Sequence, residues 1–452
     1  MKRIFKFSLA AGVVSAMSIA GMGEANAAVS TETAFVFNSF SFLVHGVLVM
    51  FMAAGFAMLE SGLVRAKNTA TICLKNISLY SIAGLMFYLI GYAVMYTNVD
   101  GGWIGTFDFL YNPAESELGL LNAADAGKEA ANAALLKDSS YASMSDWFFQ
   151  MVFVATAASI VSGVLAERIK LWPFMIFVVV LAAIIYPIQG SWVWGAGWLS
   201  EMGFSDFAGS TLVHSTGGWA ALAGAVVLGA RKGKYGPNGA VNPMPGANLP
   251  LATLGTFILW FGWFGFNGGS QLALGSAADV TAIAIVYVNT NLAAAAGVVV
   301  AMIMTQLMFK KVDLTLCLNG AIGGLVAITA GPDLQNHAYA ILIGGIGGAL
   351  VVIAVPLIDK MKIDDVVGAI SAHLVSGIWG TLAVGIFGSG SIVTQFIGIV
   401  AIGAFVFVTS LIVWLILKAT IGIRADEEEE MAGLDSSELG IEAYPEFGGG
   451  SR

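Results

Sequence analysis

One sequence pattern, Asp-x-x-Gly-x-x-x-x-His-x-x-x-Gly, occurs twice in this chain, each time at the start of an apolar segment. Each His follows its Asp by eight residues, about 12 Å along a helix that rises ~1.5 Å per residue. If the two helices run in opposite directions, both rings lie near the middle of a hydrocarbon core ~30 Å thick. A neutral imidazole carries one proton donor and one acceptor, so two such rings in contact can pass a proton. The matching residues are Asp206, Gly209, His214 and Gly218, then Asp365, Gly368, His373 and Gly377.

The composition places these histidines in a membrane. Of the 452 residues, 58% are hydrophobic and 11% are charged, which is typical of a polytopic membrane protein and excludes a soluble one. The sequence therefore predicts an all-α polytopic membrane protein with eleven transmembrane helices. An ionisable side chain at mid-membrane depth indicates a functional site. The spans are expected at 34–62, 71–98, 147–166, 171–190, 207–229, 250–271, 282–308, 314–330, 338–358, 366–388 and 391–418.

The cationic side chains predict the orientation, because they fall at alternate connections and such connections are cytoplasmic. The N-terminus is then outside and the C-terminus inside. Of the outer connections, only the one after the second span carries lysines, among an excess of Asp and Glu. Residues 1–27 read as a cleaved signal peptide ending at Ala25-Asn26-Ala27, and an uncleaved extra helix is the alternative. The inner cations are Arg65, Lys67, Arg168, Lys170, Arg231, Lys232, Lys234, Lys310, Lys311, Lys360, Lys362, Lys418 and Arg424.

The two copies of the pattern predict an inverted repeat. They lie in spans five and ten, and an odd number of crossings between them reverses the direction of the chain. Residues 34–230 and 250–390 then form two inverted five-helix repeats, followed by a final helix, within a transporter domain of residues 28–420. Such repeats place substrate sites near the membrane midplane, where the two halves meet.

Several segments resemble the signature of the ammonium transporter (Amt) family. The resemblance is strongest in Asp206-Phe-Ala-Gly-Ser-Thr-Leu-Val-His214 and extends from about Phe35 to Tyr444. It implies a non-enzymatic homotrimer in the cell inner membrane, in which each subunit has its own pore for ammonium or methylammonium. The other matching segments, in chain order, are Val64-Arg-Ala-Lys-Asn68, Leu165-Ala-Glu-Arg-Ile169, Gly262-Trp-Phe-Gly-Phe-Asn-Gly-Gly-Ser270 and Gly433-Leu-Asp435.

The resemblance also implies roles for individual residues. Aromatic faces at an outer mouth attract a cation by ~0.5–2 kcal/mol each, and a serine hydroxyl can accept one N–H bond. A hydrophobic constriction further in disfavours the ion more than neutral ammonia, so the proton must leave or travel separately. By position, the recruitment site is Phe149, Trp194 and Ser270, the phenyl gate is Phe153 and Phe266, and the pore histidines are His214 and His373.

Other polar residues in the spans are expected to be structural. Asp206 is interpreted as an electrostatic and structural anchor at the pore entrance, and Asp365 as either a helix cap worth ~1 kcal/mol or a group with a role in transport. His45 is expected to bind a backbone carbonyl. Glu60 and Lys75, near the inner ends of spans one and two, are expected to snorkel to the interface.

Other kinds of function are weighed against transport. The sequence predicts no cofactor and no nucleic-acid partner. It also predicts no metal site, because the two pore histidines lack a third ligand at a helical spacing. Hydrolase chemistry lacks a matching nucleophile as well. Two alternatives stay open: a Rh-like channel for neutral ammonia or carbon dioxide, and an ammonium receptor that signals through its tail.

The tail, residues 421–452, is polar and acidic, with a run from Glu427 to Glu430. It resembles the family's ordered cytoplasmic tail, which packs under the neighbouring subunit and communicates with PII-type nitrogen-signalling proteins. A disordered tail is the alternative. Opposite charges on the inner face are expected to hold the tail in place.

Overall fold

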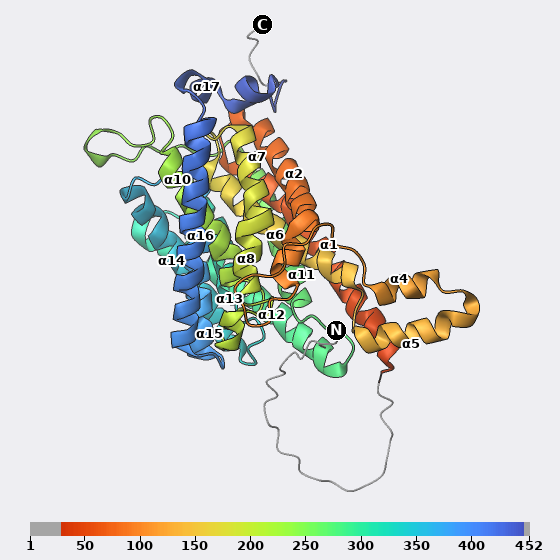
Figure 1. Cartoon of the computed structure of the whole chain (residues 1–452). Coiled ribbons are helices and arrows are strands. Elements are labelled where there is room, and N and C mark those ends of the chain that lie inside the picture. The colour runs from red at the N-terminus through yellow and green to blue at the C-terminus, as the bar shows by residue number, and fades with distance from the viewer. Residues whose placement is uncertain (1–28, 447–452) are drawn as a thin grey trace.

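The computed structural model describes residues 29–446, in which long apolar helices lie side by side as a bundle (Figure 1). Ten of these helices are long and apolar enough to cross a membrane, and an eleventh apolar helix, α13, is shorter. The predicted all-helical polytopic fold is therefore confirmed. The signal peptide predicted at residues 1–27 lies outside the described residues.

The apolar helices follow the predicted spans in order. Spans two, four, five and ten each contain a π-helical segment, labelled η, in which the backbone bonds run from residue i to i+5. The bounds are α1 Thr31–Leu63, α2 Thr69–Met86 with η2 Phe87–Gly91 and α3 Tyr92–Tyr96, α6 Ser143–Leu165, α7 Leu171–Val180 with η4 Leu181–Ile185 and α8 Tyr186–Ser191, η5 Ser210–Ser215 with α10 Thr216–Leu228, α11 Leu249–Gly269, α12 Ala277–Phe309, α13 Leu314–Ile328, α14 His337–Lys360, η7 Ile370–Val375 with α15 Ser376–Phe387, and α16 Ile392–Thr420.

Helix α13 is short because its C-terminal end meets the chain that leads into η5. It has 15 residues, about 22 Å at ~1.5 Å per residue, which is less than the hydrocarbon thickness. The carbonyls of Thr329 and Ala330, just beyond it, accept the N–H groups of Ala208 and Phe207, each over 3.0 Å. Non-helical backbone at this depth is tolerated because it is buried in protein.

Glycines let several helices approach backbone to backbone. A Cβ at Gly344 or Gly348 in α14 would collide with the backbone of α12, at Ala293 and Gly297 respectively. Without water to drive them together, helices in lipid associate by such close packing. The remaining helices lie at the two ends of the bundle: α4 Glu115–Asn122 and α5 Lys128–Asp138 in the long outer connection, α9 Trp198–Glu201, α17 Glu427–Ala432, and the π-helical η8 Asp435–Leu439.

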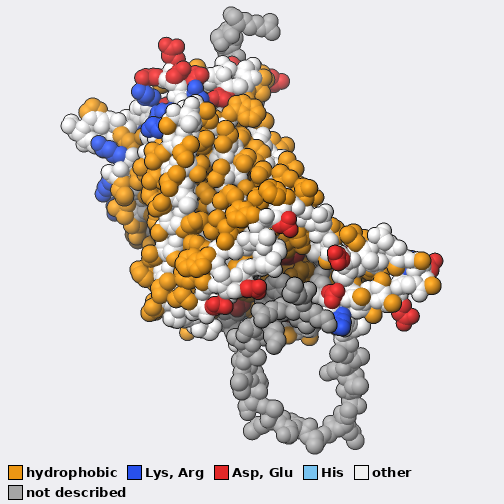
Figure 2. Space-filling view, viewed as in Figure 1, with side chains coloured by type: hydrophobic (Ala, Val, Ile, Leu, Met, Phe, Trp, Pro, Cys, Tyr) orange, Lys and Arg blue, Asp and Glu red, His pale blue; other side chains and the backbone are white. Residues whose placement is uncertain are grey.

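The two ends of the bundle differ in charge. Figure 2 shows an apolar belt along the bundle; on the face in view, most Lys and Arg side chains lie at the end where the C-terminus lies, whereas Asp and Glu lie at both ends. Among the cations there, Lys170 and Lys232 face the acidic run of the tail: Lys232 lies 2.8 Å from Glu427, and Lys170 lies 3.8 Å from Glu429. The tail up to residue 446 is thus folded against one end of its own chain, with ion pairs of the predicted sign.

Asp435 anchors the tail to the start of α2. Its carboxylate accepts the backbone N–H groups of Ala70 and Thr71, over 2.9 and 2.7 Å, and the Thr71 hydroxyl over 2.8 Å. Lys67 donates to the Glu430 carbonyl over 3.0 Å. These bonds satisfy N–H groups in the first turn of a helix, which have no partner within the helix itself.

A buried ion-pair network joins the ends of α6, α10 and α14 that lie on the side of the tail. Arg231 donates to both oxygens of Asp364 over 2.8 and 2.9 Å and lies 3.3 Å from Glu167, which also accepts from Arg65. Arg168, fully buried, donates four bonds to backbone carbonyls. Burial alone would raise the pKa of the Asp364 carboxyl, but the bonds from Arg231 and the charge of Arg168 hold it below its usual range.

Glu60 and Lys75 do not reach the interface, so the snorkelling interpretation is wrong. Each is 1% exposed. Ser162 on α6 provides the reason, because its hydroxyl donates to Glu60 over 2.7 Å and its carbonyl accepts from Lys75 over 2.9 Å. A polar partner inside the bundle removes the need for either side chain to reach water.

The buried network predicts that Asp364→Asn destabilises the fold by about 3–5 kcal/mol, because Arg231 loses the carboxylate to which it donates two hydrogen bonds and keeps only the more distant charge of Glu167 in a buried site. Thermal unfolding in detergent measures the loss. Since the folded pKa of Asp364 is lowered, its contribution is present above the unfolded-state value of ~3.9 and is lost as the pH falls below it.

Lys232→Met is the matched control for this prediction. Lys232 pairs with Glu427 at the same end of the bundle, but their side chains are 47% and 67% exposed, so the expected loss is at most ~1 kcal/mol. Equal losses in the two variants would contradict a special role for the buried network.

Candidate functional site

The two predicted Asp residues each precede a helix, Asp206 as a buried side chain and Asp365 as a half-buried one. Asp206 accepts four backbone N–H groups, those of residues 209 to 212, over 2.8 to 3.0 Å. Asp365 accepts two, from Ala369 and Ile370, over 3.0 and 2.7 Å. Burial raises the pKa of the Asp365 carboxyl to about 6, although these two N–H groups oppose the rise. Both carboxylates therefore act as helix caps.

The first glycine of each pattern turns the chain into the helix. Gly209 has φ +111° and Gly368 has φ +79°, conformations that favour glycine. Both helices start as π-helical segments, η5 at Ser210 and η7 at Ile370. The estimate of about 12 Å from Asp to His assumed a regular α-helix and is wrong in that respect, because the helix starts well after each Asp. Single π-helical turns are frequent at functional sites.

The last glycine of each pattern lets the two broken helices cross. A Cβ at Gly218 would lie 2.6 Å from the Leu374 Cβ, and one at Gly377 would lie 2.5 Å from the Ser210 carbonyl oxygen. Each helix thus places a glycine against the π-helical segment of the other. Leu374 follows His373 directly, so the crossing brings the histidine-bearing turns together.

His214 and His373 meet at this crossing. Their Nδ1 atoms are 3.2 Å apart, and the ring centroids are 5.2 Å apart with an angle of 26° between the planes. Both rings are buried, at 0% and 2% exposure. One Nδ1 must donate and the other accept, so the two rings hold complementary tautomers when both are neutral.

Aromatic rings enclose His214 on the side of α11. Trp263 stacks on it with centroids 4.9 Å apart, and Phe266 with centroids 5.1 Å apart. The Trp263 indole donates to the Thr329 hydroxyl over 2.8 Å, which fixes the ring. Sequence reasoning gave Trp263 no role. The available signal was its position three residues before Phe266, which puts both on one face of a helix.

The two rings predicted as a phenyl gate lie against each other. The centroids of Phe153 and Phe266 are 4.1 Å apart, with 32° between the planes. Phe153 is 1% exposed and Phe266 is fully buried. The pair thus lies between Trp194, which contacts Phe153, and His214, which contacts Phe266.

The three residues predicted as a recruitment site lie just outside these rings. The ring centroid of Phe149 lies 4.8 Å from that of Phe153. Trp194 is half-exposed, and its ring centroid lies 5.9 Å from that of Phe153, with an angle of 85° between the ring planes. A side chain at Gly269, next to Ser270, would collide with the Phe149 ring. The Trp194 indole donates to the Asp206 carbonyl over 3.0 Å, which ties this group to the first helix cap.

The serine of this group keeps acceptor capacity. The Ser270 hydroxyl donates to the Phe266 carbonyl over 2.8 Å, so its own lone pairs remain to accept a bond from a ligand. The structure thus brings all seven predicted recruitment, gate and pore residues into one line of contacts from Trp194 to His373.

His45 stands apart from this line, as expected. Its Nδ1 lies 2.9 Å from the Ser41 carbonyl, and its Nε2 lies 3.0 Å from the Tyr287 hydroxyl. Within residues 29–446 there is no group of three or more His, Cys, Asp or Glu side chains arranged to hold a metal ion.

Comparison with known proteins gives the family. The family model described as Ammonium Transporter Family matches residues 40–444. The chain belongs to the ammonium transporter family. This is a family of transporters rather than enzymes, and the chain is accordingly an ammonium transporter by family and a multi-pass protein of the cell membrane.

Relatives and solved structures of this ammonium transporter family match along most of the chain. Ammonium transporter Amt2 of Archaeoglobus fulgidus is 41% identical over 90% of this chain and 87% of its own. The ammonium transporter of Bacillus subtilis is 33% identical over 88% and 96%. A solved structure named Sensor Amt Protein is 37% identical, with a TM-score of 0.81, and covers 91% of this chain and 100% of its own.

The helix caps predict unequal effects at the two Asp positions. Asp206→Ala leaves four buried N–H groups without their acceptor, and each costs ~1–3 kcal/mol, so a loss of several kcal/mol is expected. Asp365→Ala leaves two such groups and should cost about half as much. Thermal unfolding in detergent compares the variants. A larger loss at Asp365 would contradict capping as the main role of Asp206.

Proposed function

We propose that this ammonium transporter binds ammonium at its outer mouth, removes a proton, and conducts ammonia inward along a pore with twin histidines while the proton travels separately. The observation that carries the proposal is the contact between His214 and His373 in an otherwise apolar, aromatic surrounding. Two rings that exchange a hydrogen bond there have no structural task that an apolar pair would not perform at lower cost.

Recruitment falls to the three residues at the mouth. Phe149 and Trp194 offer aromatic faces to a cation, and Ser270 offers a hydroxyl oxygen. Each cation–π contact contributes ~0.5–2 kcal/mol, which is enough to concentrate ammonium without holding it. The Trp194 indole N–H is occupied by the Asp206 carbonyl, so the ring presents its face rather than its donor to the mouth.

Deprotonation follows from the closed gate. Between Phe153 and Phe266 an ion finds no polar partner, so the transfer of a cation there without its water has a large free-energy cost. The same transfer costs much less for neutral ammonia. The proton is then taken along the pair of histidines, where the Nδ1 contact provides one donor and one acceptor in line.

The architecture supports an inverted repeat. The two Asp/Gly/His/Gly patterns form the same local structure twice: a carboxylate cap, a glycine with positive φ, a π-helical turn that bears the histidine, and a glycine at the crossing. Helices α1 and α11, the first of each half, also pack against each other. The inward-facing end is the one that carries the cations and the tail, so the C-terminus is placed in the cytoplasm and the N-terminus outside.

The assembly and its setting are part of the same proposal. The protein is expected to insert in the inner membrane after removal of residues 1–27, and to form a homotrimer with one pore per subunit in domain 28–420. Residues 421–452 form the cytoplasmic tail, to which a PII-type protein binds.

The proposal is tested by flux in proteoliposomes. His214→Ala or His373→Ala should lower the ammonium-driven current at least tenfold, because a single imidazole cannot complete the Nδ1 contact. Gel filtration of the same preparations reports assembly. Wild-type currents in the double alanine variant would remove the histidine pair from the mechanism.

A receptor function is the second candidate, favoured by the likeness to the structure named Sensor Amt Protein. A receptor binds ammonium without carrying it. Binding to the wild-type protein measured by calorimetry, together with labelled methylammonium uptake by the same vesicles, separates the two. Binding with no uptake above empty vesicles would favour the receptor.

The tail is predicted to affect regulation rather than insertion. Deleting residues after Arg424 removes Asp435 from the start of α2 and Glu430 from Arg424, 2.6 Å away, but leaves every membrane helix complete. The truncated protein should insert normally, and it should transport less or lose its response to a PII-type protein. Uptake and pull-down measure both effects.

Asp435→Ala is the companion variant, because it releases the tail from α2 while keeping the acidic run from Glu427 to Glu430. Loss of the PII response in the truncation alone would assign it to the acidic run, and loss in both would assign it to the docked geometry. An unaltered result in all assays would contradict a regulatory tail.

A further inference from the structure

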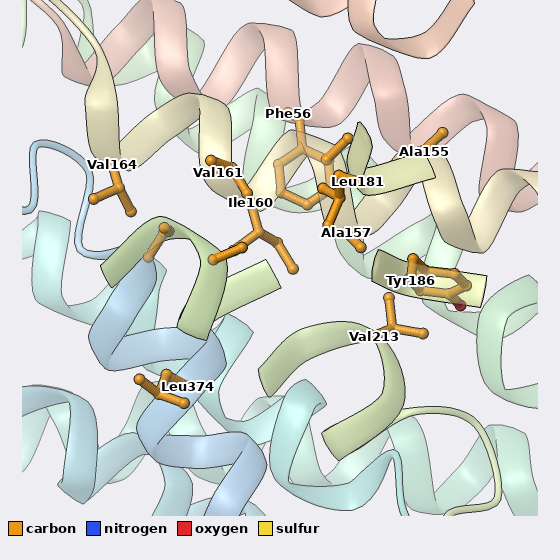
Figure 3. Packing of buried hydrophobic residues seen from close by; sticks show 14 of the residues in the cluster. Phe56, Ala155, Ala157, Ile160, Val161, Val164, Leu181, Tyr186, Val213 and Leu374 are labelled. Carbon is orange, nitrogen blue, oxygen red and sulfur yellow. The ribbon is translucent and has the colours of Figure 1, made fainter. Parts of the chain in front are cut away.

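A small cavity lies beside His373, on the far side of the histidine pair from the gate. Its lining includes Phe56 and Glu60 from α1, Ile160 from α6, and His373 itself. Its free volume of about 10 Å³ is near the lower limit for one water-sized molecule, which is also the size of ammonia. Figure 3 shows Phe56 and Ile160 close together in the buried packing, with Leu374, the neighbour of His373, in the same cluster.

Glu60 brings the only carboxylate among the residues that line this cavity. Its side chain is 1% exposed. One oxygen, Oε2, accepts the Ser162 hydroxyl over 2.7 Å, whereas Oε1 makes no hydrogen bond to a described residue; the neighbouring Asn76 amide donates to the Ile72 carbonyl instead, over 3.1 Å. A buried oxygen without a partner is costly, by ~1–3 kcal/mol, unless something that is bound only part of the time satisfies it.

Lys75 compensates the charge of Glu60 without occupying its free oxygen. The Lys75 ammonium donates to the Ser162 carbonyl over 2.9 Å and lies 5.0 Å from the Phe174 ring centroid. Ser162 thus stands between the two side chains and binds each. The two opposite charges are held apart by a serine, and a carboxylate held in this way keeps one oxygen open to a small donor.

The line of contacts therefore continues past the histidines. Phe56 has its ring centroid 6.1 Å from that of His373, and it lines the same cavity as Glu60 one helical turn further along α1. We propose that Glu60 is the proton carrier on the inner side of the histidine pair, and that it returns the proton to ammonia in the cavity beside His373. This inference rests on the proposed function.

The step balances as two proton transfers. First, the N–H bond of a protonated histidine breaks, and a water molecule of the size that the cavity can hold takes this proton while giving one of its own to Glu60 Oε1, which leaves a neutral imidazole, a neutral carboxylic acid and the water unchanged. Then the lone pair of ammonia takes that proton, which gives ammonium and restores the carboxylate. The cation leaves toward the inner end of the bundle, and one ammonium is released for each one that is bound outside.

A purely structural ion pair is the competing interpretation, and a charge-neutral double variant separates the two. Glu60→Gln keeps the shape of the side chain and removes its ability to carry a proton. Combined with Lys75→Met, it also removes the uncompensated lysine, so folding is preserved. Lys232→Met, on the surface of the inner end, is the matched control.

Each variant is reconstituted and assayed for two quantities in the same vesicles: the ammonium-driven current and the flux of neutral ammonia, followed as lumenal alkalinisation. If Glu60 carries the proton, the ratio of current to ammonia flux falls at least tenfold in Glu60→Gln and stays low in the double variant. A structural pair would change both quantities together, and the double variant would recover the wild-type ratio. A wild-type ratio in the double variant overturns the proposal.

Infrared difference spectroscopy provides a readout that is independent of flux. Adding ammonium to the wild-type protein should change the carbonyl-stretch band of a protonated carboxylic acid, and this band should be absent in Glu60→Gln. If the wild-type protein carries no current, the proposed function fails, and the band alone decides whether Glu60 exchanges a proton. No change in the band on adding ammonium overturns the assignment of Glu60.

Discussion

The meeting of the two histidines depends on one constraint: a helix that begins inside a membrane protein must find partners for its first N–H groups, because little or no water is present to satisfy them. The carboxylates of Asp206 and Asp365 meet this constraint with four and two hydrogen bonds. With their starts satisfied, η5 and η7 can begin within the protein and reach the crossing where His214 and His373 meet. The two histidines of the repeated pattern therefore depend on its two aspartates, which cap the helices that carry them.

The same constraint explains how this protein buries charge. Arg231 has Asp364 and Glu167, Arg168 has four carbonyls, and the residues Glu60 and Lys75 share Ser162. The first two sets lie at the end of the bundle that carries the tail, where they fix helix ends, although the Arg231 Nη1 atom makes no hydrogen bond to a described residue. The third set lines the cavity beside His373 and leaves one carboxylate oxygen, Glu60 Oε1, open. The difference is one of place, because the open oxygen of Glu60 lies beside the histidine pair.

Most of the fold could be predicted from the sequence, because hydropathy gives the number and order of the spans. The site could be predicted because the Asp/Gly/His/Gly pattern occurs twice and places its two histidines at equivalent positions. It failed where a tertiary partner decided the outcome. Ser162 is one small polar residue in an apolar helix, and nothing in its own sequence context indicates that it holds Glu60 and Lys75 inside. The π-helical starts were missed for a similar reason, since they depend on the caps and on the crossing. Helices α4 and α5 in the outer connection have no membrane-length hydropathy to signal them.

The packing around the proposed gate, Phe153 and Phe266, indicates which of the two rings could move at low free-energy cost. Phe266 lies between Phe153 and His214, so any rotation of Phe266 unstacks it from the imidazole and disturbs the Nδ1 contact behind it. Phe153 instead faces Phe149 and the edge of the half-exposed Trp194. Its rotation changes contacts only at the mouth, where a bound cation would itself rearrange them. The ring nearer the outside is therefore the one whose movement leaves the histidine pair intact, and a cation at the mouth is adjacent to the ring that must move to admit it.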